Sequence, residues 1–169
     1  TCACDTENGF TGTWTAPATG SDDNGCTQGS TCETNANCKS GYFCAFEDPT
    51  SCSNQGTGKC RLVSSYGVND STAGFIRSGT MSWWSAQNWC KAQGRTPATR
   101  ASIGCGDINV GGCSSGTVDE FYSSWGYGLA WLEDYGNSCE AYYVDLGFKD
   151  ISYLNKNDKN NEARFALCY

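Results

Sequence analysis

Histidine is absent from this chain of 169 residues. Without it, neither a Ser-His-Asp nor a Cys-His catalytic arrangement can form, and no histidine can ligate a metal. Apolar runs are short: none approaches the roughly 18 residues of a transmembrane helix, so we expect no membrane span. Basic residues are also few, 11 against 18 acidic ones, and they form no basic patch. This charge pattern argues against nucleic acid or an anionic membrane surface as partner.

Cysteine, by contrast, is abundant, with thirteen residues spread along the whole chain. No Cys-x-x-Cys pair occurs, so disulfides are a better interpretation than zinc sites, and we expect no metal and no cofactor. The protein is therefore expected in an oxidising place, secreted or on a cell surface. Because thirteen is odd, at least one thiol is free or pairs outside the chain. The chain starts at Thr1 without a signal peptide, so we expect an original N-terminus, with any anchor there, to be missing.

The chain divides into two regions, a cysteine-rich module at 1–62 and a second domain at 63–169. The first sixty residues hold eight cysteines among Gly, Asn, Ser and Thr. Such a segment cannot bury much apolar surface and must be held by cross-links, whose pairing the sequence does not choose. Asp22, Asp23 and Asn24 could suggest calcium, but nothing like an EF-hand follows them, so a polar loop is favoured.

The second region has readable apolar patterns. FIRSG (75–79) indicates a short strand. The next segment, 81–94, is typical of a helix that Ser82 caps and Gly94 ends, with Trp83, Ala86 and Cys90 on one face.

Three further elements follow along the chain. Thr117 and Glu120 form a capping box for a second helix that carries Val118 and Phe121. CEAYYVDLG (139–147) and RFALCY (164–169) indicate strands, the former with Ala141 and Tyr143 on one side and Tyr142, Val144 and Leu146 on the other. Two helices between flanking strands predict an α+β domain.

The tryptophans and the carboxylate pairs each have two interpretations. Trp83 and Trp125 are expected in the core rather than in a sugar-stacking groove, and Trp84 is expected to be exposed. Asp119-Glu120 and Glu133-Asp134 could in principle hydrolyse glycans. Adjacent residues do not face each other on a helix, and no neighbour suggests a raised pKa, so we expect no enzyme activity.

From about Gly74 to Tyr169 the chain resembles the C-type lectin-like fold. The matching residues are Trp83, Ala86, Cys90 and Gly94, then Cys139, and finally the ALCY ending. The resemblance implies a disulfide between Cys90 and Cys168. Such a bond would close a loop that contains nearly the whole domain. By lowering the conformational entropy of the unfolded chain, it would stabilise the fold by roughly 4–5 kcal/mol.

The sequence departs from the sugar-binding members of that family. Those members hold calcium with an acidic-proline loop and a WND-like triplet before a cysteine. Here GFKDISY (147–153) stands in that place, and a lysine ammonium at Lys149 opposes a bound cation. The resemblance therefore implies calcium-independent binding. Cys139 loses the partner it has in the family, and Cys113 or Cys105 is offered instead.

The C-terminal tract, residues 131–165, is rich in Tyr, Asn, Ser and Asp, the residue types of adaptable binding surfaces. It resembles the variable region of proteins diversified by retroelements, in which asparagine codons scatter but never become Lys, Glu, Gln or Trp. The resemblance implies that Lys149, Lys156, Lys159 and Glu162 are fixed. It also implies these variable, ligand-binding residues: Tyr135, Asn137, Phe148, Asp150, Ser152, Tyr153, Asn155, Asn157, Asp158, Asn160 and Asn161.

We therefore expect a secreted or surface-displayed protein whose lectin-like domain binds a ligand through this C-terminal surface. A protein on another surface is the first candidate ligand, and a glycan is the second. Tyr135, Phe148 and Tyr153 are the expected anchors, because interfaces concentrate binding energy in aromatic side chains. The alternative is a structural envelope or pilus component whose lectin-like domain only packs.

Overall fold

The computed structural model describes residues 2–3, 13–14, 29–46, 55–106, 112–113, 116–135, 139–156 and 164–169. In this part of the chain, side chains are left undescribed at 2–3, 13–14, 68–70, 134, 135 and 155. The protein is α+β, as the sequence predicts, with helices that pack against antiparallel and mixed sheets. A small sheet pairs β1 (Cys2–Ala3) with β2 (Thr13–Trp14).

A three-stranded antiparallel sheet follows, in the order β3 (Thr31–Cys32), β5 (Gly58–Leu62) and β4 (Tyr42–Ala45). Disulfides join Cys32 to Cys44 and Cys38 to Cys60. A side chain at Gly58 would place its Cβ 2.6 Å from the sulfur of Cys44, so glycine is needed for the strands to approach. One cross-link joins the two outer strands, β3 and β4, and the other ties Cys38 to the middle strand β5, so disulfides supply what the few apolar residues here cannot.

The large sheet has six strands in the order β10-β9-β8-β11-β7-β6. Their bounds are β6 (Gly67–Thr72), β7 (Phe75–Thr80), β8 (Leu129–Tyr135), β9 (Glu140–Asp145), β10 (Asp150–Asn155) and β11 (Arg164–Cys168). The last strand, β11, lies inside the sheet, antiparallel to β7 and parallel to β8, and all five of its residues are buried. The strand predicted from RFALCY is therefore confirmed.

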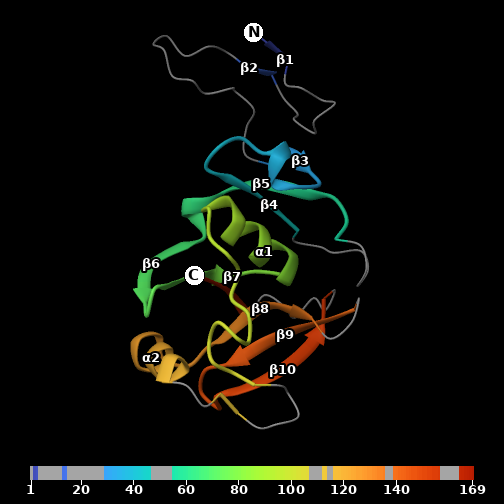
Figure 1. Ribbon diagram of the computed structural model, residues 1–169. Coiled ribbons are helices and arrows are strands. Elements are labelled where there is room, and N and C mark those ends of the chain that lie inside the picture. Colours follow the sequence, from blue (N-terminus) through green and yellow to red (C-terminus); the bar gives the residue numbers. More distant parts are fainter. Residues whose placement is uncertain are drawn as a thin grey trace.

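Helix α1 (Trp83–Ala92) connects the two sheets. Ser82 caps it by accepting a hydrogen bond from the Ser85 N–H, and Gly94 follows its end with a φ of +68°. Figure 1 shows the three-stranded sheet on one side of α1 and strands β8 to β10 on the other. Trp83, Ala86 and Cys90 are buried, and Cys90 is bonded to Cys168 of β11. The predicted helix and its disulfide are present.

The contact between the three-stranded sheet and α1 is partly polar, and its serine and asparagine side chains are hydrogen-bonded. Ser82 and Ser85 donate hydrogen bonds to the Phe46 carbonyl, and the Phe46 N–H donates to the Ser85 hydroxyl at 2.8 Å. The Asn88 amide donates to the Cys44 carbonyl at 2.9 Å. Phe43 of β4 is fully buried in the same apolar cluster as Trp89. The cysteine-rich module therefore shares a core with the second region.

Helix α2 (Gly116–Trp125) covers the other part of the core. It begins two residues earlier than the predicted capping box requires, so Thr117 lies in the first turn rather than at the cap. Val118, Phe121 and Trp125 are buried, and the Phe121 and Trp125 rings stack with centroids 4.8 Å apart. The core roles predicted for Trp83 and Trp125 are confirmed.

Two expectations need correction. Cys105 and Cys113 are bonded to each other, so neither is the partner of Cys139, which is itself disulfide-bonded. A bridge over eight residues closes easily because the two ends need little chain to meet. Trp84 is half-buried rather than exposed, since it packs against apolar clusters of both regions.

None of the helices in the described ranges is long and apolar enough to cross a bilayer. The four disulfides quoted above are consistent with an oxidising environment.

Candidate ligand-binding surface

The turn between β9 and β10 holds Phe148 out from the protein. One carboxylate oxygen of Asp145 accepts hydrogen bonds from the N–H groups of Gly147 and Phe148, at 2.9 and 3.1 Å. Lys149 has a φ of +55°, and its carbonyl accepts a bond from the Cys113 N–H at 2.8 Å. The backbone is fixed, whereas the Phe148 side chain is 79% exposed. Because the backbone is already ordered, binding through Phe148 costs little backbone entropy, which suits an anchor.

An ion pair between Lys149 and Asp119 joins this turn to α2. Figure 1 shows α2 close to the end of β9, where the turn begins. Both side chains are about half exposed, so the pair adds little to stability. It does place an ammonium group beside the turn.

Tyr127 is a second exposed aromatic side chain beside the turn, and the sequence analysis missed it. It is 64% exposed, and its hydroxyl donates to the other carboxylate oxygen of Asp145 at 3.3 Å. A Cβ at Gly147 would lie 2.5 Å from the Tyr127 ring, so glycine is needed for the ring to lie against the turn. The available signal was its position between Gly126 and Gly128 after a helix, which is not a core pattern. Tyr127 and Phe148 thus lie at one turn.

The negative charge of Asp145 raises the pKa of Tyr127 above its usual 10.0, with desolvation and the hydrogen bond acting in the same direction. We expect Asp145→Asn to move the titration of Tyr127 to lower pH, because the phenolate then no longer faces a carboxylate while the turn keeps its acceptor. Ultraviolet titration of phenolate absorbance measures this. Subtracting the curve of Tyr127→Phe isolates the transition, and an unchanged midpoint in Asp145→Asn would contradict the geometry.

Tyr153 lies near the far end of β10 and is 49% exposed. Its ring meets Tyr142 edge to face, with centroids 6.4 Å apart, and the Arg100 guanidinium lies 4.9 Å from the Tyr142 ring. Phe148 and Tyr153 are five positions apart, which is at most about 17 Å along an extended chain. A partner that buries about 800 Å² on this side would span both. The two predicted anchors are therefore exposed and belong to one hairpin.

The other predicted residues of β10 have mixed positions. Asp150 is exposed and Ser152 is half-buried. Ile151, between them, is buried in the core, and Leu154 packs against the cluster around α1. The segment 147–161 is therefore not purely polar surface, since β10 is an unforeseen strand that also contributes to the core.

Several candidates cannot be placed. Tyr135 ends β8 and Asn155 ends β10, but their side chains lie outside the described part. Asn137, Asn157, Asp158, Asn160 and Asn161 fall outside the described residues, as do Lys159, Glu162 and the Asp22-Asp23-Asn24 cluster.

Two buried cations, Lys156 and Arg164, stand in the sequence on either side of the polar segment 157–163. The ammonium of Lys156 lies 4.4 Å from the Trp83 ring and 5.5 Å from the Trp84 ring, and burial lowers its pKa. The guanidinium of Arg164 lies 4.1 Å from the Tyr143 ring and 5.1 Å from the Trp131 ring. Desolvated contacts of this kind contribute about 2 kcal/mol. They show why so polar a stretch can adjoin a core strand: the residues beside it are themselves anchored in the core.

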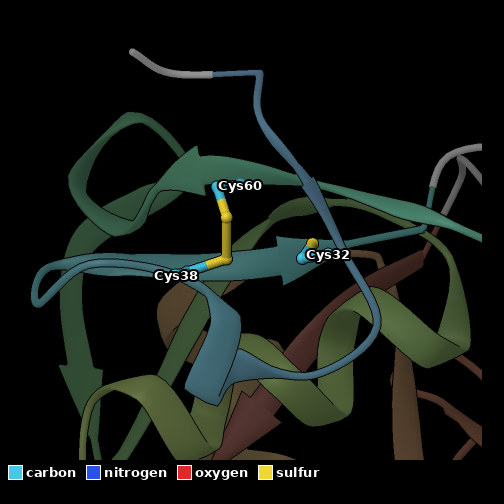
Figure 2. Close-up of side chains that lie close together, drawn as sticks. All are labelled: Cys32, Cys38 and Cys60. Carbon is cyan, nitrogen blue, oxygen red and sulfur yellow. A yellow bond between two sulfur atoms is a disulfide. The ribbon is translucent and has the colours of Figure 1, made fainter. Parts of the chain in front are cut away.

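Three cysteine sulfurs gather at the three-stranded sheet of β3, β4 and β5. The sulfur atoms of Cys32, Cys38 and Cys60 lie within 4.8 Å of one another, which is close enough for metal ligands. Figure 2 shows the bond between Cys38 and Cys60, with Cys32 beside it. Cys32 is bonded to Cys44. Because a thiolate is the metal ligand, this cluster in its disulfide form does not hold a metal.

One of the carboxylate pairs considered for hydrolysis lies on α2 and the other on β8. Asp119 and Glu120 are both exposed on α2, and Asp119 is engaged by Lys149. Glu133 is half-buried, and the Asp134 side chain lies outside the described part.

A cleft of about 710 Å³ lies where the three-stranded sheet meets β6, β7 and the end of α1. Its walls include Leu62, Val63, Ile76 and Arg95. Of the predicted ligand-binding residues that the structure describes, none lines it.

Comparisons with known proteins do not extend this picture: the chain matches no family model, and no curated protein and no solved structure is significantly similar to it.

Proposed function

We propose that the protein is an extracellular or surface-displayed binding protein with a calcium-independent C-type lectin-like domain. The hairpin β9–β10 and the polar tract after it form the ligand-binding surface. The observation that carries the proposal is Phe148, a large apolar side chain that is 79% exposed on a turn fixed by Asp145. Single exposed apolar residues are common, but one held on an ordered turn beside Tyr127 and on the same hairpin as Tyr153 favours an interface.

Diversification by a retroelement is the second part of the proposal. Its support is the density of Asn, Ser, Asp and Tyr in the tract, together with the position of two lysines that such copying would leave fixed. Lys156 is buried against tryptophans, and Lys149 joins the turn to α2. Substitution of the buried Lys156 would disturb the core, and substitution of Lys149 would remove the ion pair to α2, so constancy at the two positions would have a physical reason. Sequencing this gene in many isolates tests the idea: variation spread evenly over the chain would refute it.

Binding itself is tested by screening the purified full chain against arrays of surface proteins and glycans. We expect a ligand whose binding is lost with Phe148→Ala. If no ligand binds, the domain is a structural component rather than a binding module. If Phe148→Ala binds the ligand equally well, the ligand-binding surface lies elsewhere on the protein.

Calcium should affect neither stability nor binding. A bound ion raises the melting temperature with the logarithm of its concentration over its dissociation constant. Because the Lys149 ammonium lies at the turn, we expect the same melting temperature in millimolar calcium and in chelator, and equal affinity for the ligand. A calcium-dependent rise that disappears in Asp150→Asn would contradict this account.

A further inference from the structure

The aromatic side chains at the β9–β10 turn lie among carboxylates. We define the tip surface as Tyr127, Asp145, Phe148 and Asp150. Asp145 holds the turn, and Asp150 is exposed at the start of β10. One oxygen of Asp150 accepts the N–H of Ile151 at 2.8 Å. Glu120 is exposed on the neighbouring helix.

The positively charged side chains near the tip surface already contact other groups of the protein. Lys149 pairs with Asp119, and Arg164 is buried between Tyr143 and Trp131. Within the described residues, the carboxylates of Asp145, Asp150 and Glu120 face no cation in an ion pair. The whole chain carries a net charge of -7, so its long-range field has the same sign as the tip.

Exposed aromatic rings beside unpaired carboxylates recognise one kind of group particularly well. A guanidinium or ammonium is attracted to the ring face by the quadrupole and to the carboxylate by its charge. The stem of an arginine or lysine also packs on apolar surface such as that of Phe148. A neutral sugar could stack on the rings, but it carries no charge that the carboxylates would attract.

We propose that the tip surface binds a basic segment of a partner protein, with an arginine or lysine side chain set between Phe148, Tyr127 and the carboxylates. This inference rests on the proposed binding function and names the chemistry of its partner. Electrostatic attraction then governs the approach of the partner, while Phe148 supplies the apolar contact.

The test uses the full chain and an array of random peptides graded by net charge. We expect the bound peptides to be enriched in arginine and lysine. Their affinity should fall roughly tenfold when salt rises from about 0.05 M to 0.5 M, because the screening length shortens over that range. Replacing arginine by citrulline in the best peptide should weaken binding by a similar factor.

A matched pair of variants separates local from overall charge. Asp150→Asn removes one charge at the tip, and Glu33→Gln removes one from an exposed side chain of the cysteine-rich module. Asp150→Asn should weaken peptide binding about three- to tenfold and flatten its salt dependence, whereas Glu33→Gln should do neither.

The outcomes distinguish this inference from the function it rests on. If Phe148→Ala abolishes binding of peptides without basic enrichment, or of a glycan on the companion array, the basic partner is wrong and the binding surface stands. If the selected peptides respond equally to Asp150→Asn and Glu33→Gln, the tip assignment is wrong. If basic peptides bind and Phe148→Ala leaves them unaffected, both proposals fail.

Discussion

Replacing Cys90 and Cys168 together by alanine is expected to lower the free energy of unfolding by about 4–5 kcal/mol. The bond spans 78 residues and ties α1 to the central strand β11. Without the bond, the unfolded chain gains the conformational entropy of a loop that covers most of the second region. Both cysteines are buried, so the small cavities left by alanine destabilise the fold further. Denaturant unfolding monitored by tryptophan fluorescence measures the change.

The bridge between Cys105 and Cys113 is the matched control. It closes only eight residues, so the same entropy model gives about 2.5 kcal/mol for its removal. We therefore expect the alanine pair at 90 and 168 to be the more destabilising by about 2 kcal/mol. Equal losses would show that chain entropy does not set the contribution of these bonds.

The elements around α1 follow from local sequence signals. Ser82 and Gly94 mark the ends of the helix, and its apolar spacing identifies the buried face that carries Cys90. The alternation in 140–146 also holds, with Tyr142 and Val144 in one core cluster and Ala141 in the other. These features depend on neighbours in sequence, which is why a single chain reveals them.

Other features depend on contacts that the sequence does not display. Strand β10 was missed because Asp150, Ser152 and Asn155 read as a polar loop, although Ile151 and Leu154 face the core. The pairing of Cys105 with Cys113 needs a turn between them whose geometry spacing alone leaves open.

The sequence predicts two of the exposed aromatic residues at the candidate site but not the third. Phe148 and Tyr153 stand out as aromatics in a polar tract. Tyr127 joins them only because the fold brings the end of α2 to Gly147, where the absence of a side chain leaves room for its ring. The hydrogen bond of Tyr127 to Asp145 links residues that are 18 positions apart.

The double variant Phe148→Ala, Tyr153→Ala is expected to weaken ligand binding by about a thousandfold or more. Central aromatic anchors lose 2 kcal/mol or more each on truncation, and two such losses give a factor of about a thousand. The fold should be retained, because Phe148 is 79% exposed and Tyr153 makes one edge-to-face contact, with Tyr142. We expect a stability cost below about 1.5 kcal/mol. Adding Tyr135→Ala extends the test to the third predicted anchor.

The most direct test of the binding surface is the affinity of one ligand from the surface screen for three proteins: the unmodified chain, the double variant and Tyr169→Ala. Tyr169 is 45% exposed, close to the 49% of Tyr153, but it packs against Phe75 of β7 rather than on the hairpin. We predict that the double variant loses about a thousandfold in affinity while Tyr169→Ala binds like the unmodified chain. A double variant that folds and still binds with unchanged affinity, or an equal loss in Tyr169→Ala, would contradict the assignment of the ligand-binding surface to the β9–β10 hairpin.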